Sequence, residues 1–276
     1  MKRMCVMLCA LELMMGCSLG DEAKIGSFVS DVVKRARVNR STSGLTHVDS
    51  VFDHVSGGTS DTKTPVEQIY EKLKNRVEEY RRTFRTVRFK FKQDQHQFSI
   101  PIFEKFIKLN EAKWDMIYAA LGYDVNIIRK LETMMSKITL QELDDKLKSA
   151  SGVVFCLSNR LYAVTYYFKS VLVDHLNDVS LEQLSLIKSE EDLTKLYDTL
   201  KILSDLMSKF IAQSKIVIKK AAKFENDNEA MLNEFVEMLS FERPVGKLIL
   251  GIIQIGRGIQ EFVDGKDEEV DEKDLY

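Results

Sequence analysis

Residues that break helices are scarce in this chain. Its 276 residues include only three prolines and thirteen glycines, whereas charged residues make up 30%. No stretch of strand length alternates apolar and polar side chains with the period of two that a half-buried strand requires. Long aliphatic and charged side chains favour helices instead. The sequence therefore predicts an all-α fold, a single bundle of about six to seven helices.

Charge of one sign is equally scarce. The 40 basic and 42 acidic side chains leave a formal net charge of −2. A protein dedicated to nucleic acid shows a basic excess, and this chain has none. We therefore expect no nucleic-acid partner.

Cysteine is almost absent from the body of the chain. Cys156 is the one cysteine after Cys17, so no disulfide can form within the part that follows Cys17. Cys156 lies among Val153, Val154 and Phe155, and this apolar setting favours a buried, inert thiol over a catalytic nucleophile. The chain must hold itself together by core packing.

Catalytic and metal-binding patterns are also lacking. The histidines, at positions 47, 54, 96 and 175, have no cysteine or carboxylate partner at ligand spacing, so we expect no metal site. The glycines between residues 246 and 258 lie inside a helical apolar pattern rather than in a phosphate-binding loop after a strand. No nucleophile motif surrounds a serine. We therefore expect no enzyme activity and no dissociable cofactor.

The N-terminus has the pattern of an export signal. An apolar run over residues 5–15 follows two basic residues and ends in Gly16 and Cys17. This order resembles a bacterial lipoprotein signal, in which cleavage needs a small side chain at Gly16 and the Cys17 thiol accepts diacylglycerol. Met14 and Glu12 depart from the usual pattern, so an ordinary secretory signal or an uncleaved N-terminus are the alternatives.

The lipoprotein interpretation divides the chain into four parts. Residues 1–16 form the signal peptide, and residues 17–63, rich in serine, threonine and glycine, form a flexible tether. Residues 64–263 form the helical domain, and the acidic tail, 264–276, is expected to be disordered. The covalent diacylglycerol and N-acyl chain on Cys17 would tie the protein to the outer membrane, which is the first partner that we expect.

The helical domain begins at a strong capping signal. Thr64-Pro65-Val66-Glu67 places a capping threonine, a proline at the first helical position and a glutamate three residues after the cap. Apolar residues then recur at spacings of four and three up to about residue 93, which predicts one long helix. Its seam consists of Val66, Tyr70, Leu73, Val77, Tyr80, Phe84, Val87 and Phe91. The pattern suits a bundle or a coiled coil equally.

Basic residues of this first helix lie off the seam. Arg81, Arg82, Arg85 and Arg88, with Lys90, form a basic face that is a candidate contact for a partner. The alternative is a face that is merely solvated. The sequence offers no better candidates for partner binding.

Further start and stop signals predict the remaining helices. They are expected over 101–121, ending at Gly122; from Asp124 to Ile138; in a short element capped by Thr139 and Glu142; after Gly152 to Leu176, at the centre of the bundle; in a connecting turn from Ser180; from Ser189 to about Phe224; and over 231–239.

The segment 244–263 is unusually apolar and contains four glycines. A transmembrane helix needs about 20 apolar residues, and Lys247, Arg257 and Gln260 leave too short a run. We expect this helix to be buried in a groove or to form an oligomer interface. In the second case a homodimer is a further expected partner. A membrane-active helix is the third alternative.

Two stretches resemble a known family. IYAALGYD at 117–124 and HLNDVSLEQL at 175–184, continued by the apolar pattern up to Ile218, look like the borrelial all-helical surface lipoproteins. That family includes the complement-regulator-acquiring proteins and is also labelled virulent-strain-associated lipoprotein. The resemblance spans roughly residues 100–223. The glycine-rich helix, the acidic tail and the arginine-rich first helix depart from the family.

The resemblance implies a spirochaetal outer-surface protein, a helical bundle on a lipid-anchored stalk. Some relatives bind complement regulators, terminal complement components or plasminogen, and some dimerise through a C-terminal helix. The resemblance assigns no ligand-contact residue in this chain. We expect a surface protein that binds a host serum or matrix macromolecule, such as a complement component, in immune evasion. The alternatives are a structural envelope lipoprotein facing the periplasm and an adhesin or plasminogen binder.

Overall fold

The computed structural model describes residues 63–93, 98, 100–106, 110–138 and 148–265. Within these ranges the chain is all-helical and contains nine α-helices, with no strand. The fold class is as expected, but the predicted number of helices is too low. Four predicted features lie outside the described residues: the signal peptide with Gly16 and Cys17, the tether, the short element capped by Thr139 and nearly all of the acidic tail.

The helices follow one another with short connections. Their bounds are α3 Pro65–Gln93, α4 Pro101–Phe106, α5 Glu111–Ala120, α6 Val125–Ser136, α8 Lys148–Ser170, the π-helix η2 Val171–His175, α9 Asp178–Ile187, α10 Glu190–Ala221, the 3-10 turn η3 Ala222–Phe224, α11 Asn228–Leu239 and α12 Pro244–Asp264.

Two differences explain the higher number of helices. The helix expected over 101–121 is divided, because the side chain of Asn110 accepts the Lys113 amide at 3.0 Å and opens α5 as a new helix. The connecting turn expected from Ser180 is a ten-residue helix, α9, which begins after the cap Asn177. In both places the cap is an asparagine.

Helix α3 begins as the sequence predicts. The Thr64 amide donates to the Glu67 carboxylate at 2.6 Å, and the Glu67 amide donates to the Thr64 hydroxyl at 3.3 Å. Leu73, Val77 and Phe91 of the predicted seam are buried, but Val87 is 40% exposed. The helix packs on α10 and α9 of its own chain, which corresponds to the bundle alternative.

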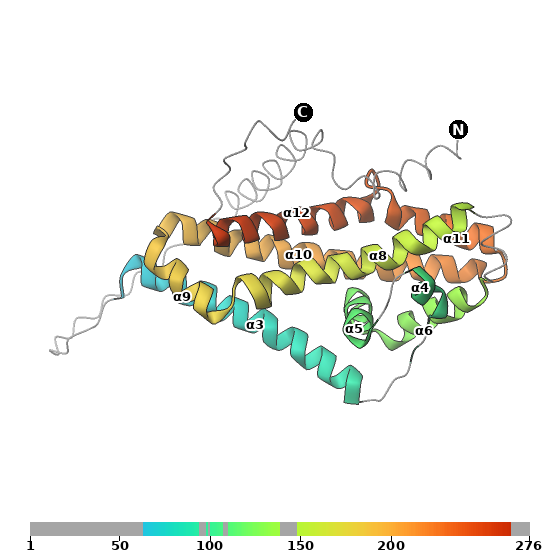
Figure 1. Cartoon of the computed structure of the whole chain (residues 1–276), viewed down its shortest axis with the longest axis horizontal. Helices are drawn as coiled ribbons and strands as arrows, with labels where there is room; N and C mark the ends of the chain where they lie inside the picture. Colours follow the sequence, from blue (N-terminus) through green and yellow to red (C-terminus); the bar gives the residue numbers. More distant parts are fainter. Residues whose placement is uncertain (1–62, 94–97, 99, 107–109, 139–147, 266–276) are drawn as a thin grey trace, which may run out of the picture.

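Helices α8 and α10 form the middle of the bundle, and Figure 1 shows them running side by side beneath α12. The apolar face predicted for α8 is buried, including Val154, Leu161 and Phe168. Helix α8 begins at Lys148 rather than after Gly152. Helix α10 begins at the predicted Ser189, whose side chain accepts the Asp192 amide in a capping box.

Helix α12 lies in a groove of its own bundle. It packs against α10, α8 and α11, and Val245, Ile249, Ile252 and Ile259 are buried there. Three of its glycines are buried: Gly251 faces α10, Gly256 faces α8, and Gly246 faces the connection between α11 and α12. Across the described ranges, no helix has both the length and the apolar character to cross a membrane.

Figure 1 shows that α3 diverges from the bundle toward its C-terminal end, with α4, α5 and α6 between this end and α8. Helix α3 contacts η2 and α9, while α5 packs on α8. This arrangement brings the second half of α3 opposite the end of α8.

Candidate functional site

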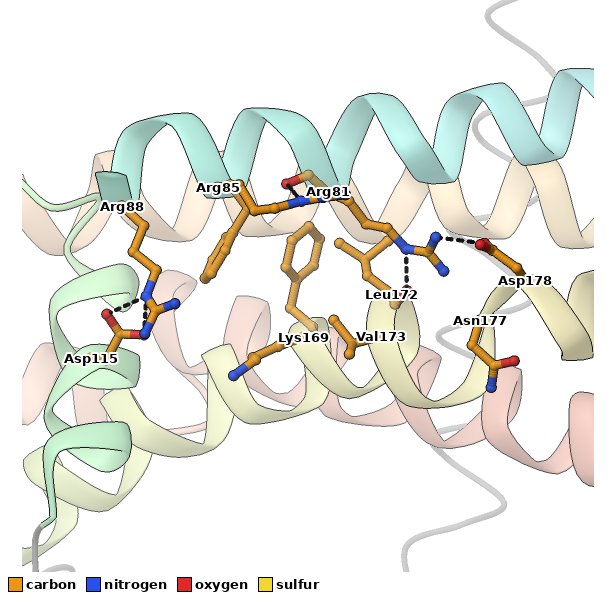
Figure 2. A pocket seen from close by; sticks show the side chains of 11 residues that line it. Arg81, Arg85, Arg88, Asp115, Lys169, Leu172, Val173, Asn177 and Asp178 are labelled. Carbon is orange, nitrogen blue, oxygen red and sulfur yellow. Dashed lines mark hydrogen bonds and ion pairs between the residues drawn. The ribbon is translucent and has the colours of Figure 1, made fainter. Parts of the chain in front are cut away.

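A cavity of about 390 Å³ lies between the second half of α3 and the end of α8 with η2. Asp115 of α5 bounds one end, and the start of α9 bounds the other (Figure 2). Its lining combines apolar and charged side chains: Arg81, Phe84, Arg85, Arg88, Asp115, Phe168, Lys169, Leu172, Val173, Asn177 and Asp178. Three of the four arginines that the sequence singles out therefore line one cavity.

Arg81 is bonded within its own chain, so the alternative of a merely solvated side chain does not hold for this residue. Its side chain is only 15% exposed. The guanidinium donates to the Leu172 carbonyl at 2.8 Å and to the Leu176 carbonyl, and it pairs with Asp178 at 2.9 Å (Figure 2). Arg81 thus ties α3 to both η2 and the start of α9.

The reason for these bonds is the π-helix at the end of α8. The Leu176 amide donates to the Val171 carbonyl five residues earlier, at 2.9 Å, and the helix then ends. Carbonyls at a helix end lack partners within the helix. The guanidinium of Arg81 supplies donors to two of them. Short π-helical stretches often mark functional sites.

Arg88 closes the other end of the cavity. Its Nε lies 2.8 and 2.9 Å from the two oxygens of Asp115, whose side chain is 7% exposed. The Tyr123 hydroxyl also donates to Asp115, at 3.2 Å. Burial raises the pKa of Tyr123, so the phenol stays protonated and remains a donor. The hydrogen bond to Asp115 raises the pKa of Arg88, which keeps the guanidinium charged.

The other two arginines face solvent. Arg85 is 66% exposed and pairs with Glu78 at 2.8 Å. Arg82 is exposed and forms no hydrogen bond or ion pair with another residue of the described ranges. Lys169 of α8, which the sequence did not single out, also lines the cavity and has no such partner among the described residues. The cavity therefore combines two cations fixed in ion pairs, Arg81 and Arg88, with two cations that are able to contact a ligand. These two are Arg85 and Lys169.

Cys156 and His175 are the remaining sequence candidates that the structure describes. Cys156 is buried and reduced. His175 forms a hydrogen bond with the Ser170 hydroxyl at 3.1 Å, within the turn that carries η2. In the ranges that the structure describes, no three metal-ligating side chains come together.

Comparison with known proteins yields no family: no known protein family and no curated protein matches this chain. The resemblance to the borrelial surface lipoproteins therefore stays a prediction.

Proposed function

We propose that this protein is a lipid-anchored binding protein of a bacterial outer surface, and that its helical domain contacts a host macromolecule such as a complement component. The observation that carries the proposal is the basic surface of α3 beside an open cavity with apolar walls. Arg82 and Arg85 are exposed, and Phe89 of the same helix is also exposed. Exposed arginine and aromatic side chains together are typical of protein contact surfaces.

The anchor rests on the N-terminal sequence. Gly16 and Cys17 follow a basic pair and an apolar run, as in a bacterial lipoprotein signal. Acyl chains on Cys17 would contribute about 0.8 kcal/mol per buried methylene group, enough for stable attachment when more than one chain is present. Residues 17–63 would separate the bilayer from the start of α3, at a distance suited to contact with large partners.

The cavity favours binding over catalysis. Its lining supplies cations and apolar contacts, which hold and orient a partner. Its two carboxylates, on Asp115 and Asp178, are both engaged by arginines. A carboxylate held in an ion pair is a poor general base.

Surface display is tested by adding protease to intact cells and detecting the helical domain with an antibody. Loss of the antibody-detected domain from protease-treated intact cells supports surface exposure. Complete protection, with digestion only after the outer membrane is opened, would instead favour a structural lipoprotein that faces the periplasm. A Cys17→Ser strain serves as the control, because it cannot be acylated and should release the protein from the membrane fraction.

Host binding is tested with the full chain carrying Cys17→Ser on a solid support in serum. We expect the double variant Arg82→Glu, Arg85→Glu to lose most of the captured partner. The matched control is Lys201→Glu, Lys209→Glu, which reverses two exposed charges on α10 outside the cavity. Equal capture by both double variants would exclude the α3 surface as the contact, and capture of plasminogen rather than a complement component would identify the alternative partner.

A further inference from the structure

We propose that the cavity beside α3 binds a compact organic anion, an apolar body that carries a carboxylate. The body would lie against the apolar wall, and the carboxylate would lie between Lys169 and Arg85. The proposal deepens the proposed function, on which it rests, because it names the chemistry that this surface recognises.

The apolar wall is preformed. Phe168 and Leu172 are buried at the floor, on the last turns of α8 and the start of η2. Val173 lines the same cavity but is 49% exposed, so its apolar surface is not covered by the bundle. A cavity of about 390 Å³ lies within the range of small-ligand sites. An apolar group placed here would remove the exposed face of Val173 from water.

The two ends of the cavity limit the length of the ligand. Arg81 with Asp178 closes one end, and Arg88 with Asp115 closes the other (Figure 2). The two arginines are seven positions apart on α3, which corresponds to about 10 Å along the helix. Extended peptide advances about 3.3 Å per residue, so about three residues fit between the ends. This length suits a compact ligand and not a helix that runs through the cavity.

The charge of the lining selects an anion. The arginines at the two ends are neutralised by Asp178 and Asp115, so the excess positive charge belongs to Arg85 and Lys169. These side chains come from the two helices that face each other across the cavity (Figure 2). Arg85 forms an ion pair with the half-exposed Glu78, and its Nε donates to the Arg81 carbonyl at 3.4 Å. Exposed ion pairs of this kind are worth about 0–1 kcal/mol. A carboxylate that accepts from both cations would form stronger, charge-assisted hydrogen bonds.

The test uses anilinonaphthalenesulfonate, an aromatic anion whose fluorescence rises in apolar surroundings. It is titrated into the full chain carrying Cys17→Ser, without detergent. We expect saturable binding that is at least about fivefold weaker in Lys169→Gln and in Arg85→Gln, because each loses one charge-assisted contact. Val173→Asp should abolish it, since a carboxylate would then stand in the cavity. Lys201→Gln on α10 is the matched control and should bind as the parent does.

Structural damage is separated from loss of contact by Arg85→Lys, which keeps the charge and should recover most of the affinity lost in Arg85→Gln. All of these positions are partly or fully exposed, so circular dichroism should show unchanged helix content. Absence of saturable binding, or binding that all the cavity variants leave unchanged, would overturn the proposal.

Two competitors then distinguish the source of the anion. Displacement by octanoate indicates a free short-chain carboxylate, and displacement by acetyl-Glu-Phe-Glu-amide indicates an acidic segment of a protein partner. Displacement by neither overturns the assignment to carboxylates. These measurements use purified protein, whereas surface display and serum capture are measured separately, so each proposal can fail without the other.

Discussion

At the scale of single residues, two glycines of α12 occupy very different surroundings. A Cβ atom built at Gly246 would lie 1.9 Å from the Ser240 carbonyl oxygen and 2.8 Å from the Phe241 Cα. Nothing lies within 4 Å of a Cβ atom at Gly258. Gly246 must be a glycine because the connection before α12 lies too close for a side chain. Gly258 has room for one.

We expect Gly246→Ala to lower the free energy of unfolding by about 1–3 kcal/mol, because backbone atoms must shift. Gly258→Ala should raise it by about 0.5–1 kcal/mol, because alanine favours the helix and meets no obstacle. Urea denaturation followed by circular dichroism measures both. Equal changes in the free energy of unfolding for the two variants would contradict the packing of α12 on the segment before it.

Asp124 predicts a dependence of stability on pH. Its carboxylate accepts from the amides of Asn126 and Ile127 at 3.1 and 3.3 Å and pairs with Lys215 at 3.0 Å. Burial raises the pKa of Asp124, but the bonds from Lys215 and the amides outweigh it, so the net pKa is lowered from 3.8. The lowered pKa means that folding favours the charged form.

The stabilisation by Asp124 is therefore present above about pH 4, and it is lost as the pH falls through the lowered pKa of the folded state. Asp124→Asn keeps a capping side chain but loses the ion pair, which should cost about 1 kcal/mol near pH 7. Urea denaturation of both proteins from about pH 7 downward should show the difference shrinking in acid. A difference that stays constant with pH would contradict the ion pair.

At the scale of the elements, Arg81 holds the junction of α3, η2 and α9. We expect Arg81→Ala to lower the free energy of unfolding by about 2–3 kcal/mol, because the carbonyls of Leu172 and Leu176 lose a charged donor. Arg81→Lys should recover little, since one ammonium cannot reach both carbonyls and Asp178 in this geometry. The measurement is again urea denaturation.

Arg82→Ala is the matched control, because Arg82 is the next residue of the same helix and is exposed. It should leave the stability within about 0.5 kcal/mol of the parent. If the two alanine variants were equally stable, Arg81 would not hold the π-helical junction.

At the scale of the whole molecule, α12 belongs to the core. Val245, Ile249, Ile252, Ile255 and Ile259 are buried against the rest of the bundle. Burial of five such side chains contributes about 8–15 kcal/mol, which matches the entire stability of a typical domain. The helix is therefore part of the folding unit and not an appendage.

We expect a chain that stops after Arg243 to lose cooperative unfolding and to aggregate, whereas a chain that stops after Gly265 should keep both its helix content and its size. Size-exclusion chromatography and thermal unfolding followed by circular dichroism compare the two. A soluble chain without α12 that still unfolds cooperatively would show that the helix does not complete the core.

The parts of this protein that were predictable are local. Thr64 with Glu67, Asp124 and Ser189 cap their helices through bonds that span three residues, so short stretches of sequence contain both partners. The burial of the α8 and α10 faces follows from the spacing of apolar residues along one helix. The break between α4 and α5 was missed, although the cap Asn110 lies in the sequence, because the apolar pattern continues on both sides of it.

The sequence by itself determined an all-helical chain, most helix ends and most of the buried faces, because these depend on neighbours within a turn or two. Only the tertiary structure decided which of the four arginines are buried and bonded and which are exposed, since their spacing along α3 does not distinguish them. Arg81 donates to carbonyls 91 and 95 residues away, and Arg88 donates to a carboxylate 27 residues away. Arg82 is exposed and bonds to no other described residue. Contacts over such separations arise from packing, and no local pattern contains them.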